Sequence, residues 1–133
     1  MSRFVKQSDV RRDTLEWGEI GWRCAPPETG ARHIVVMDVS LAPGQAHDFH
    51  RHPDQEEMII VRSGTIDQWI EREHASLSPG DSVYLDSGAV HASFNDGPET
   101  AHLQVIIGPS IGESGYVLED VAAQQPWASL RAG

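Results

Sequence analysis

Three histidines and a pair of glutamates are the side chains of this sequence best suited to bind a metal ion. His50 and His52 stand two residues apart in "HRHPDQEEMIIVRSG", where a Pro-Asp turn separates them from Glu56 and Glu57. Alternate residues of a β-strand project to the same side, so the two imidazoles can bind one ion. His91, further along, is either a core histidine or a third ligand. Beside a His-x-His strand and a glutamate, the ligand interpretation is favoured.

The strand after the turn indicates which glutamate accompanies the histidines. Glu57 shares its face with Ile59 and Val61, which suit a barrel interior. Glu56 shares its face with Arg62, which suits an exterior. The alternation therefore favours Glu57 as the inward carboxylate. It does not decide the matter, because both faces of this strand carry apolar residues.

Three imidazoles and one carboxylate suit a single divalent transition-metal ion, which could be iron, manganese, nickel, cobalt, copper or zinc. Four protein ligands on a six-coordinate ion leave two positions for water, dioxygen or a pair of substrate oxygens. The only cysteine is Cys24, so a Cys-rich zinc site and an internal disulfide are excluded. The lack of thiolate ligands also argues against copper(I).

Weaker candidates surround these residues. Glu56, His47 and Tyr84 are candidate general bases, although the position of His47 before the ligand strand favours an exposed loop residue over a contact with substrate. His102 and Gln104 share one face of the last clear strand. They are candidate substrate-binding residues if that face lines the pocket.

The elements that must position these side chains are short strands separated by turns. Strand patterns cover residues 32–41, 56–63, 65–73, 82–85, 90–95 and 101–108. This spacing predicts an all-β antiparallel barrel or sandwich with little helix. Weak helical patterns occur at 8–17 and 118–125, the second stopped by Pro126. We expect a single domain over residues 1–133, with its core at about 32–110 and an extension at each end.

Charge and hydrophobicity exclude several classes of partner. The 133-residue chain has a formal net charge of −10, and its longest basic cluster is the pair Arg11-Arg12. Nucleic acid and anionic membranes are therefore unfavourable partners. No stretch has the features of a signal peptide or the ~18 apolar residues of a membrane span. We expect a cytoplasmic protein that acts on a small molecule.

The spacing of these residues resembles the first motif of the cupin superfamily. That motif is Gly, five residues, His, one residue, His, three or four residues, Glu, six residues, Gly. The corresponding residues here are Gly44, His50, His52, Glu57 and Gly64. The six residues before the closing glycine also select Glu57.

The second cupin motif is Gly, five residues, Pro, one residue, Gly, two residues, His, three residues, Asn. The corresponding residues here are Gly80, Asp86, Gly88, His91 and Asn95. Only Asp86 departs from the pattern, and aspartate is itself a turn-forming residue. We expect Asp86 to keep the turn rather than act in catalysis, and Asn95 to pin the turn at "NDG".

The resemblance implies a cupin-type antiparallel β-barrel, also called a jelly roll, with one metal ion bound by His50, His52, Glu57 and His91. The resemblance gives little evidence about the type of reaction, because one fold supports many chemistries. We favour an oxygen-using dioxygenase. The alternatives are an isomerase, epimerase or lyase acting on a sugar, uronate or hydroxy acid, and a non-catalytic binding protein. Small cupins commonly form homodimers, for which "WGEIGW" and "TIDQWIERE" are expected to offer apolar outer surface.

Overall fold

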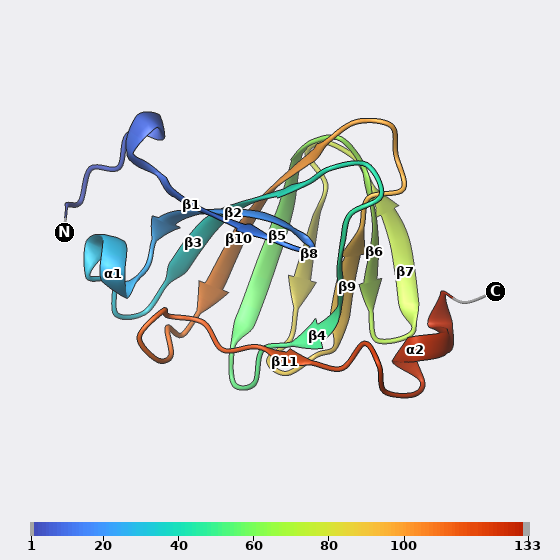
Figure 1. The fold of residues 1–133 in the computed structure, drawn as a ribbon. Helices are drawn as coiled ribbons and strands as arrows, with labels where there is room; N and C mark the ends of the chain where they lie inside the picture. The colour runs from blue at the N-terminus through green and yellow to red at the C-terminus, as the bar shows by residue number, and fades with distance from the viewer. Residues whose placement is uncertain (1, 132–133) are drawn as a thin grey trace.

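The computed structural model describes residues 2–131 and contains two antiparallel sheets that face each other (Figure 1). In spatial order, the six-stranded sheet A contains β1 (Arg11–Leu15), β2 (Gly18–Cys24), β3 (Val35–Leu41), β10 (Ala101–Gly108), β5 (Glu56–Ser63) and β8 (Ser82–Leu85). The five-stranded sheet B contains β11 (Glu119–Asp120), β4 (Ala46–Arg51), β9 (His91–Phe94), β6 (Ile66–Ile70) and β7 (Glu73–Leu77). The described helices are a 3-10 turn (Gln7–Asp9), α1 (Pro26–Thr29) and α2 (Trp127–Leu130). The predicted all-β barrel with little helix is confirmed.

Strict alternation gives sheet A one apolar face. On β3, every second residue from Val35 to Leu41 is buried, and the residues between them are partly exposed. β5 follows the same rule, with Glu57 only 6% exposed and Glu56 exposed. The structure therefore has the register of β5 that the alternation favoured.

The main core begins earlier in the chain than the predicted boundary at residue 32. Ile20 and Trp22 of β2 are buried against β3, in the same apolar cluster as Met37. Of the segment 8–17, where a short helical turn is predicted, Ser8 and Asp9 lie in the 3-10 turn, and residues 11–15 form the strand β1, which pairs with β2. Pairing of β1 with β2 overrides the weak local helical preference of this segment.

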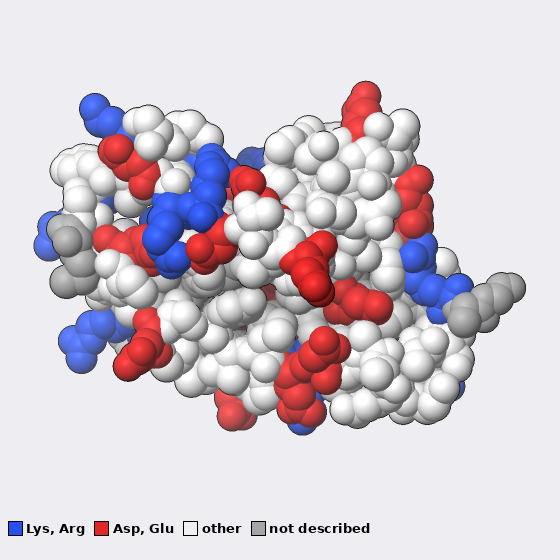
Figure 2. Space-filling model, viewed as in Figure 1, with Lys and Arg blue, Asp and Glu red and all other residues white. Residues whose placement is uncertain are grey.

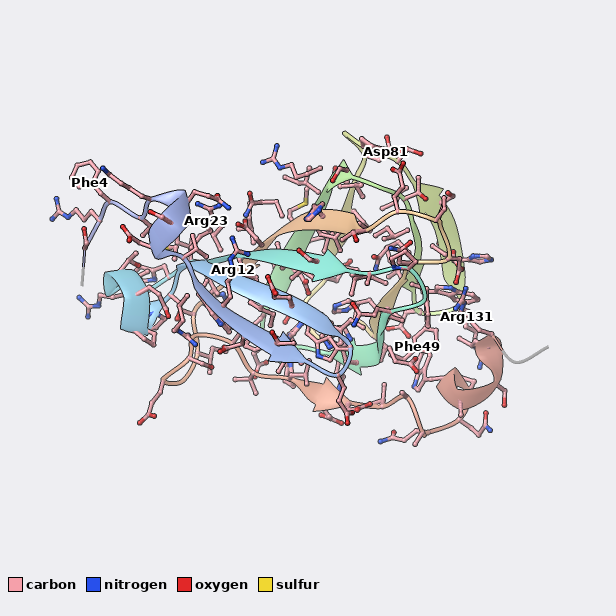
Figure 3. All side chains as sticks on the ribbon, turned by 45° about the horizontal axis from the view of Figure 1, so that its top comes forward. Phe4, Arg12, Arg23, Phe49, Asp81 and Arg131 are labelled. Atoms are coloured by element: carbon pink, nitrogen blue, oxygen red, sulfur yellow. The ribbon has the colours of Figure 1, made fainter. Side chains whose placement is uncertain are left out.

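A second apolar cluster covers the outer face of sheet B. It includes Phe49, Trp69 and Phe94 from the sheet, with Val121 and Trp127 from the C-terminal segment packed against them. This segment runs along β4 and ends at α2 (Figure 1). Figure 3 places Phe49 and Arg131 at this end of the molecule.

The helix predicted at 118–125 is wrong. Glu119 and Asp120 form β11 and pair with β4, and the backbone N–H of Val121 donates to the carbonyl of Phe49 at 3.0 Å. The free energy gained from these contacts with sheet B exceeds the weak helical preference of the eight residues. Pro126 precedes a helix, α2, instead of ending one.

The surfaces expected to join two copies are covered within the chain itself. Trp22 is 5% exposed in the main core, and Trp69 is 7% exposed beneath the C-terminal segment. The expectation that these two segments offer apolar outer surface is therefore wrong. The exposed large apolar side chains include Ile34, Tyr84 and Ile106.

Charged side chains of both signs are mixed on the surface. Figure 2 shows a basic group beside acidic side chains on the face that carries β1 and β2. A guanidinium nitrogen of Arg12 lies 3.2 Å from Oε1 of Glu19, and Nε of Arg23 lies 2.7 Å from Oδ2 of Asp38. Within residues 2–131, no helix is both long enough and apolar enough to cross a bilayer.

Candidate metal centre

Three buried histidines converge on the inner face of sheet B. His50 lies near the end of β4 and pairs directly with His91, the first residue of β9, while His52 follows β4. One ring nitrogen from each histidine can be chosen such that all three atoms lie within 4.8 Å of one another. The group is compatible with a single metal ion.

Backbone carbonyls hold the three rings in a common orientation. Each Nδ1 lies within hydrogen-bonding distance of a carbonyl oxygen: His50 to Asp48 at 2.7 Å, His52 to Val117 at 2.7 Å and His91 to Ala89 at 3.0 Å. A carbonyl only accepts, so each Nδ1 carries a hydrogen and donates it. Nε2 is then the ring nitrogen left to bind an ion, which is the arrangement of a metal-binding histidine.

Glu57 reaches the histidines from the opposite sheet. Its Oε1 lies 3.2 Å from Nε2 of His52 and 3.0 Å from Nε2 of His91. Although they are close, Oε1 of Glu57 and Nε2 of His91 have no hydrogen-bond partner among the described residues, and both are buried. Buried polar atoms without partners are costly. An ion bound between these atoms would satisfy both, so the donor set fits a divalent metal.

Electrostatic coupling between the two sheets is strong at this point. Burial alone would raise the pKa of Glu57, but His91 and His52 together hold it below its ordinary value. Burial alone would lower the pKa of His91, and the Glu57 carboxylate raises it instead. Glu57 is therefore ionised at neutral pH and available as an anionic ligand.

A stack of three rings connects the histidines to the edge of the cavity. His47 stacks on His50 with ring centroids 3.6 Å apart, and Trp17 stacks on His47 at 3.9 Å with an interplanar angle of 4°. Trp17 lies in the turn between β1 and β2. Burial lowers the pKa of His47 to about 3, so the ring is neutral at physiological pH. Of the weaker catalytic candidates, His47 is the one that the structure brings to the cavity.

The cavity is narrow and mostly apolar. Its free volume is about 30 Å³, which is room for one or two water molecules. Its apolar wall is supplied by Ile20, Met37, Val39, Leu41, Ile59, Leu103, Val105 and Ile107. Trp17, His47, Ser93 and Tyr116 complete the lining around the metal-ligand candidates.

Two other catalytic candidates lie outside the cavity. Glu56 precedes the inward Glu57, and Tyr84 lies next to the buried Leu85, so both point away from the histidines. The hydroxyl of Tyr84 donates to Oε1 of Glu56 at 2.6 Å, and this bond raises the pKa of Tyr84. The structure gives neither residue access to a ligand in the cavity.

The substrate-binding candidates His102 and Gln104 are also on the wrong face. Leu103 and Val105 point inward, so the residues that alternate with them point outward. His102 lies 3.2 Å from the hydroxyl of Ser40, and Gln104 donates to Asp38 at 2.9 Å on the outer surface. They share one face as predicted, but that face does not line the cavity.

The sequence analysis missed Gln55, which is 1% exposed. Its Nε2 donates to the carbonyls of Pro109 at 2.8 Å and Gly115 at 3.0 Å, and its Oε1 accepts from the N–H of Val117 at 2.9 Å. These bonds hold the segment that supplies the carbonyl bonded to His52. The same segment places the ring of Tyr116 5.2 Å from the His52 ring. No local pattern identifies Gln55, because its partners lie far along the chain.

Asp86 keeps the turn expected of it. The N–H of Ala89 donates to the carbonyl of Asp86 at 3.0 Å, and the Asp86 side chain is exposed. It does not line the cavity. The loss of the motif proline is therefore accommodated by backbone geometry.

Comparison with known proteins identifies the family of this chain and structures with a similar fold. The profile of the family described as "Cupin domain" matches residues 37–107, and no curated protein matches the chain. The polyketide cyclase RemF from Streptomyces resistomycificus is 19% identical, with a TM-score of 0.73 over 98% of this chain and 99% of that chain. KdgF from Halomonas sp. is 16% identical, with a TM-score of 0.71 over 85% and 98%. An oxalate decarboxylase–formate complex from Lactobacillus farciminis is 19% identical, with a TM-score of 0.75 over 94% and 39%. At these identities the structures share the fold.

Proposed function

The chain belongs to the cupin family, and from this premise we propose that it is a metal-dependent enzyme acting on a small molecule. One divalent transition-metal ion would be bound by His50, His52, Glu57 and His91. The observation that carries the proposal is the common orientation of the three histidine rings. Their Nδ1 hydrogens are donated to carbonyls, and Nε2 of His52 and of His91 lies 3.2 and 3.0 Å from Oε1 of the buried Glu57.

Within this class we favour an oxygen-using dioxygenase. When bound, the ion would supply Lewis acidity and, if it is redox-active, electron exchange with dioxygen. The apolar walls from β3, β5 and β10 would exclude water, and the neutral His47 would border the open side of the cavity. A narrow, mostly apolar cavity suits dioxygen and an apolar substrate, which supports this reaction class.

The alternative is a metal-dependent isomerase, epimerase or lyase. Two fold neighbours, a polyketide cyclase and an oxalate decarboxylase, are named for reactions of carbonyl compounds and carboxylates. In such a reaction a metal acts as a Lewis acid while a base moves a proton. His47 is the uncommitted base candidate at the cavity. The second alternative is a non-catalytic binding protein.

Reconstitution with different metals separates these possibilities. The metal-free protein would be loaded with iron(II), manganese, nickel or zinc and tested on catechols, diketones, flavonoids, hydroxy acids and uronates, with and without oxygen. A dioxygenase consumes oxygen with iron and is inactive with zinc, which has no accessible redox state. Equal turnover without oxygen would establish the isomerase or lyase alternative. A rise in melting temperature without turnover would indicate binding alone.

Homodimer formation remains a prediction, as does a cytoplasmic location. If two copies pair, the outer face of sheet A, with Ile34, Tyr84 and Ile106 exposed, is a better surface than the covered segments around Trp22 and Trp69. Light scattering at micromolar concentration tests this. A monomer mass alone would contradict the dimer.

A further inference from the structure

The cavity beside the histidines has no fixed positive charge of its own. Neither lysine nor arginine occurs among its lining residues. Histidines bind a metal ion as neutral rings. The positive charge available to a substrate therefore comes from the ion that the site is proposed to bind.

The charge on that site sets the charge of the best ligand. A divalent ion and the Glu57 carboxylate together carry one net positive charge. A substrate with one negative charge would neutralise it, whereas a second negative charge would be buried against an apolar wall without a partner. Burial of an unpaired charge is strongly unfavourable.

The cavity also has few free hydrogen-bonding groups. The hydroxyl of Ser93 already donates to Gln68 at 2.6 Å. The Nδ1 atoms of His50, His52 and His91 are bonded to backbone carbonyls. The polar groups that remain at the edge are the His47 ring and the hydroxyl of Tyr116. A polyhydroxylated sugar acid would lose more hydrogen bonds to water than this lining could replace.

The edge of the cavity is aromatic. Trp17, His47 and Tyr116 present flat rings, and Trp17 is stacked on His47 in the turn between β1 and β2. The free volume of about 30 Å³ is room for one or two water molecules only. A planar substrate must therefore displace the Trp17 ring or replace it on His47.

We propose that the substrate is a largely apolar, planar molecule that binds the ion through two oxygens carrying a single negative charge. Enolised β-diketones and phenols with a neighbouring oxygen have this chemistry, and dicarboxylates and sugar acids do not. The inference rests on the proposed metal-dependent function and narrows its substrate.

Acetylacetone and malonate form a matched pair of probes. Both chelate an ion through a six-membered ring, but acetylacetone binds as a monoanion and malonate as a dianion. Each would be titrated against nickel-loaded protein, because nickel(II) reports binding in its absorption spectrum without turnover. Each affinity would be divided by the affinity of the same ligand for aqueous nickel. We expect the ratio of these corrected affinities, acetylacetone over malonate, to be about tenfold or more. An unchanged ratio, or one shifted toward malonate, would overturn the proposal.

Two variants and one prior measurement complete the test. Glu57→Gln removes one negative charge at nearly constant shape, so at saturating nickel it should move the ratio back toward malonate. Trp17→Ala widens the entrance without changing charge, so it should admit larger β-diketones and keep the preference. A Glu57→Gln ratio equal to that of the unmodified protein would contradict the charge argument. Nickel stoichiometry is measured first, since a protein that binds no metal refutes the proposed function itself.

Discussion

Gln55 and Asn95 form the same set of hydrogen bonds near opposite ends of the barrel. Each is 1% exposed, donates two side-chain N–H groups to backbone carbonyls and accepts one backbone N–H. Asn95 donates to Leu41 and Glu99, both at 2.8 Å, and accepts from Gly97 at 3.0 Å. Each amide therefore closes one loop and leaves no polar atom unsatisfied.

The two loops differ in what they carry. The segment held by Gln55 brings the Val117 carbonyl to His52 and the Tyr116 ring to the cavity. The loop held by Asn95 contributes no residue to the cavity lining. The same bonding pattern thus stabilises the fold at one end, and at the other end it also orients a metal-ligand candidate.

The largest effect is expected from removing the ligand itself. His52→Ala should reduce bound metal from about one equivalent per chain to a small fraction of one equivalent. The loss of metal affinity should exceed the ~100-fold that removal of a ligand's hydrogen-bond partner costs. Elemental analysis of the gently purified protein checks this. Asn95→Ala is the control and should keep its full metal content. Normal metal content in the His52 variant would show that the histidines do not form the site.

A pair of nearly isosteric substitutions tests the comparison directly. Gln55→Glu places an oxygen opposite the carbonyls of Pro109 and Gly115, which repel it, so the loop shifts and His52 loses its acceptor. Metal affinity should fall by about 10- to 100-fold, as measured by competition with a chelator.

Asn95→Asp makes the same chemical change at the other end of the barrel. It should lower the melting temperature to a similar extent, with metal affinity kept within about twofold, because its loop carries no ligand. Calorimetry of both variants provides the stability measurement. Equal losses of metal affinity in the two variants would remove the distinction between the loops.

The pH dependence of stability should also originate at the metal end. Among residues 2–131, the buried ionisable side chains are His50, His52, Glu57 and His91, and half-buried His47 stacks on this group. The pKa values of His47 and His50 lie below the ordinary 6.5 because burial disfavours the charged ring. Below pH 6.5 the unfolded chain therefore binds protons that the folded chain does not, so the metal-free protein loses stability.

For His47 the expected loss is about 1.7 kcal/mol between pH 6.5 and 5, and His50 adds a loss of the same sign. His91 acts in the opposite direction: its pKa is raised, so its contribution is complete below 6.5 and is lost as pH rises. The loss of stability from His47 and His50 together exceeds the opposite contribution of His91. Glu57, whose pKa is lowered, adds a further loss below its ordinary 4.5. Denaturant unfolding of the metal-free protein at several pH values tests the sign, and constant stability from pH 7 to 5 would contradict it.

The smallest effect is expected on the outer face of β5. Glu56→Gln should change the free energy of unfolding by less than about 0.5 kcal/mol and leave metal affinity unchanged, because Glu56 is exposed. Glu57→Gln should weaken metal binding strongly. If the two variants showed the reverse order, β5 would be shifted by one residue, and every side chain would face the other way.

Local alternation made much of this structure predictable. It placed Glu57 inward beside Ile59 and Val61, and the motif spacing indicated that Asn95 pins a turn, which its hydrogen bonds confirm. The glycine of the first motif at position 64 is needed for two reasons. Its φ is +75°, and a Cβ there would lie 2.7 Å from the carbonyl oxygen of Thr100.

The rest was not predictable because it depends on contacts that local patterns do not encode. Gln55 bonds residues 54 to 62 positions away in a segment without regular structure. Alternation grouped His102 with Gln104 but could not show that their face of β10 is the outer one. The helical preference at 118–125 failed because pairing with β4 and burial of Val121 outweighed it.

The three stacked rings at the cavity edge make Trp17 an optical reporter of the metal. Its indole lies 3.9 Å from His47, which lies 3.6 Å from the ring of His50. An excited indole so close to an open-shell ion loses its energy without emitting light. Copper(II) or nickel(II) should therefore quench the share of tryptophan fluorescence that disappears in Trp17→Ala, whereas zinc, with its filled d shell, should quench it much less. Occupancy of the site can then be followed in a cuvette without a label.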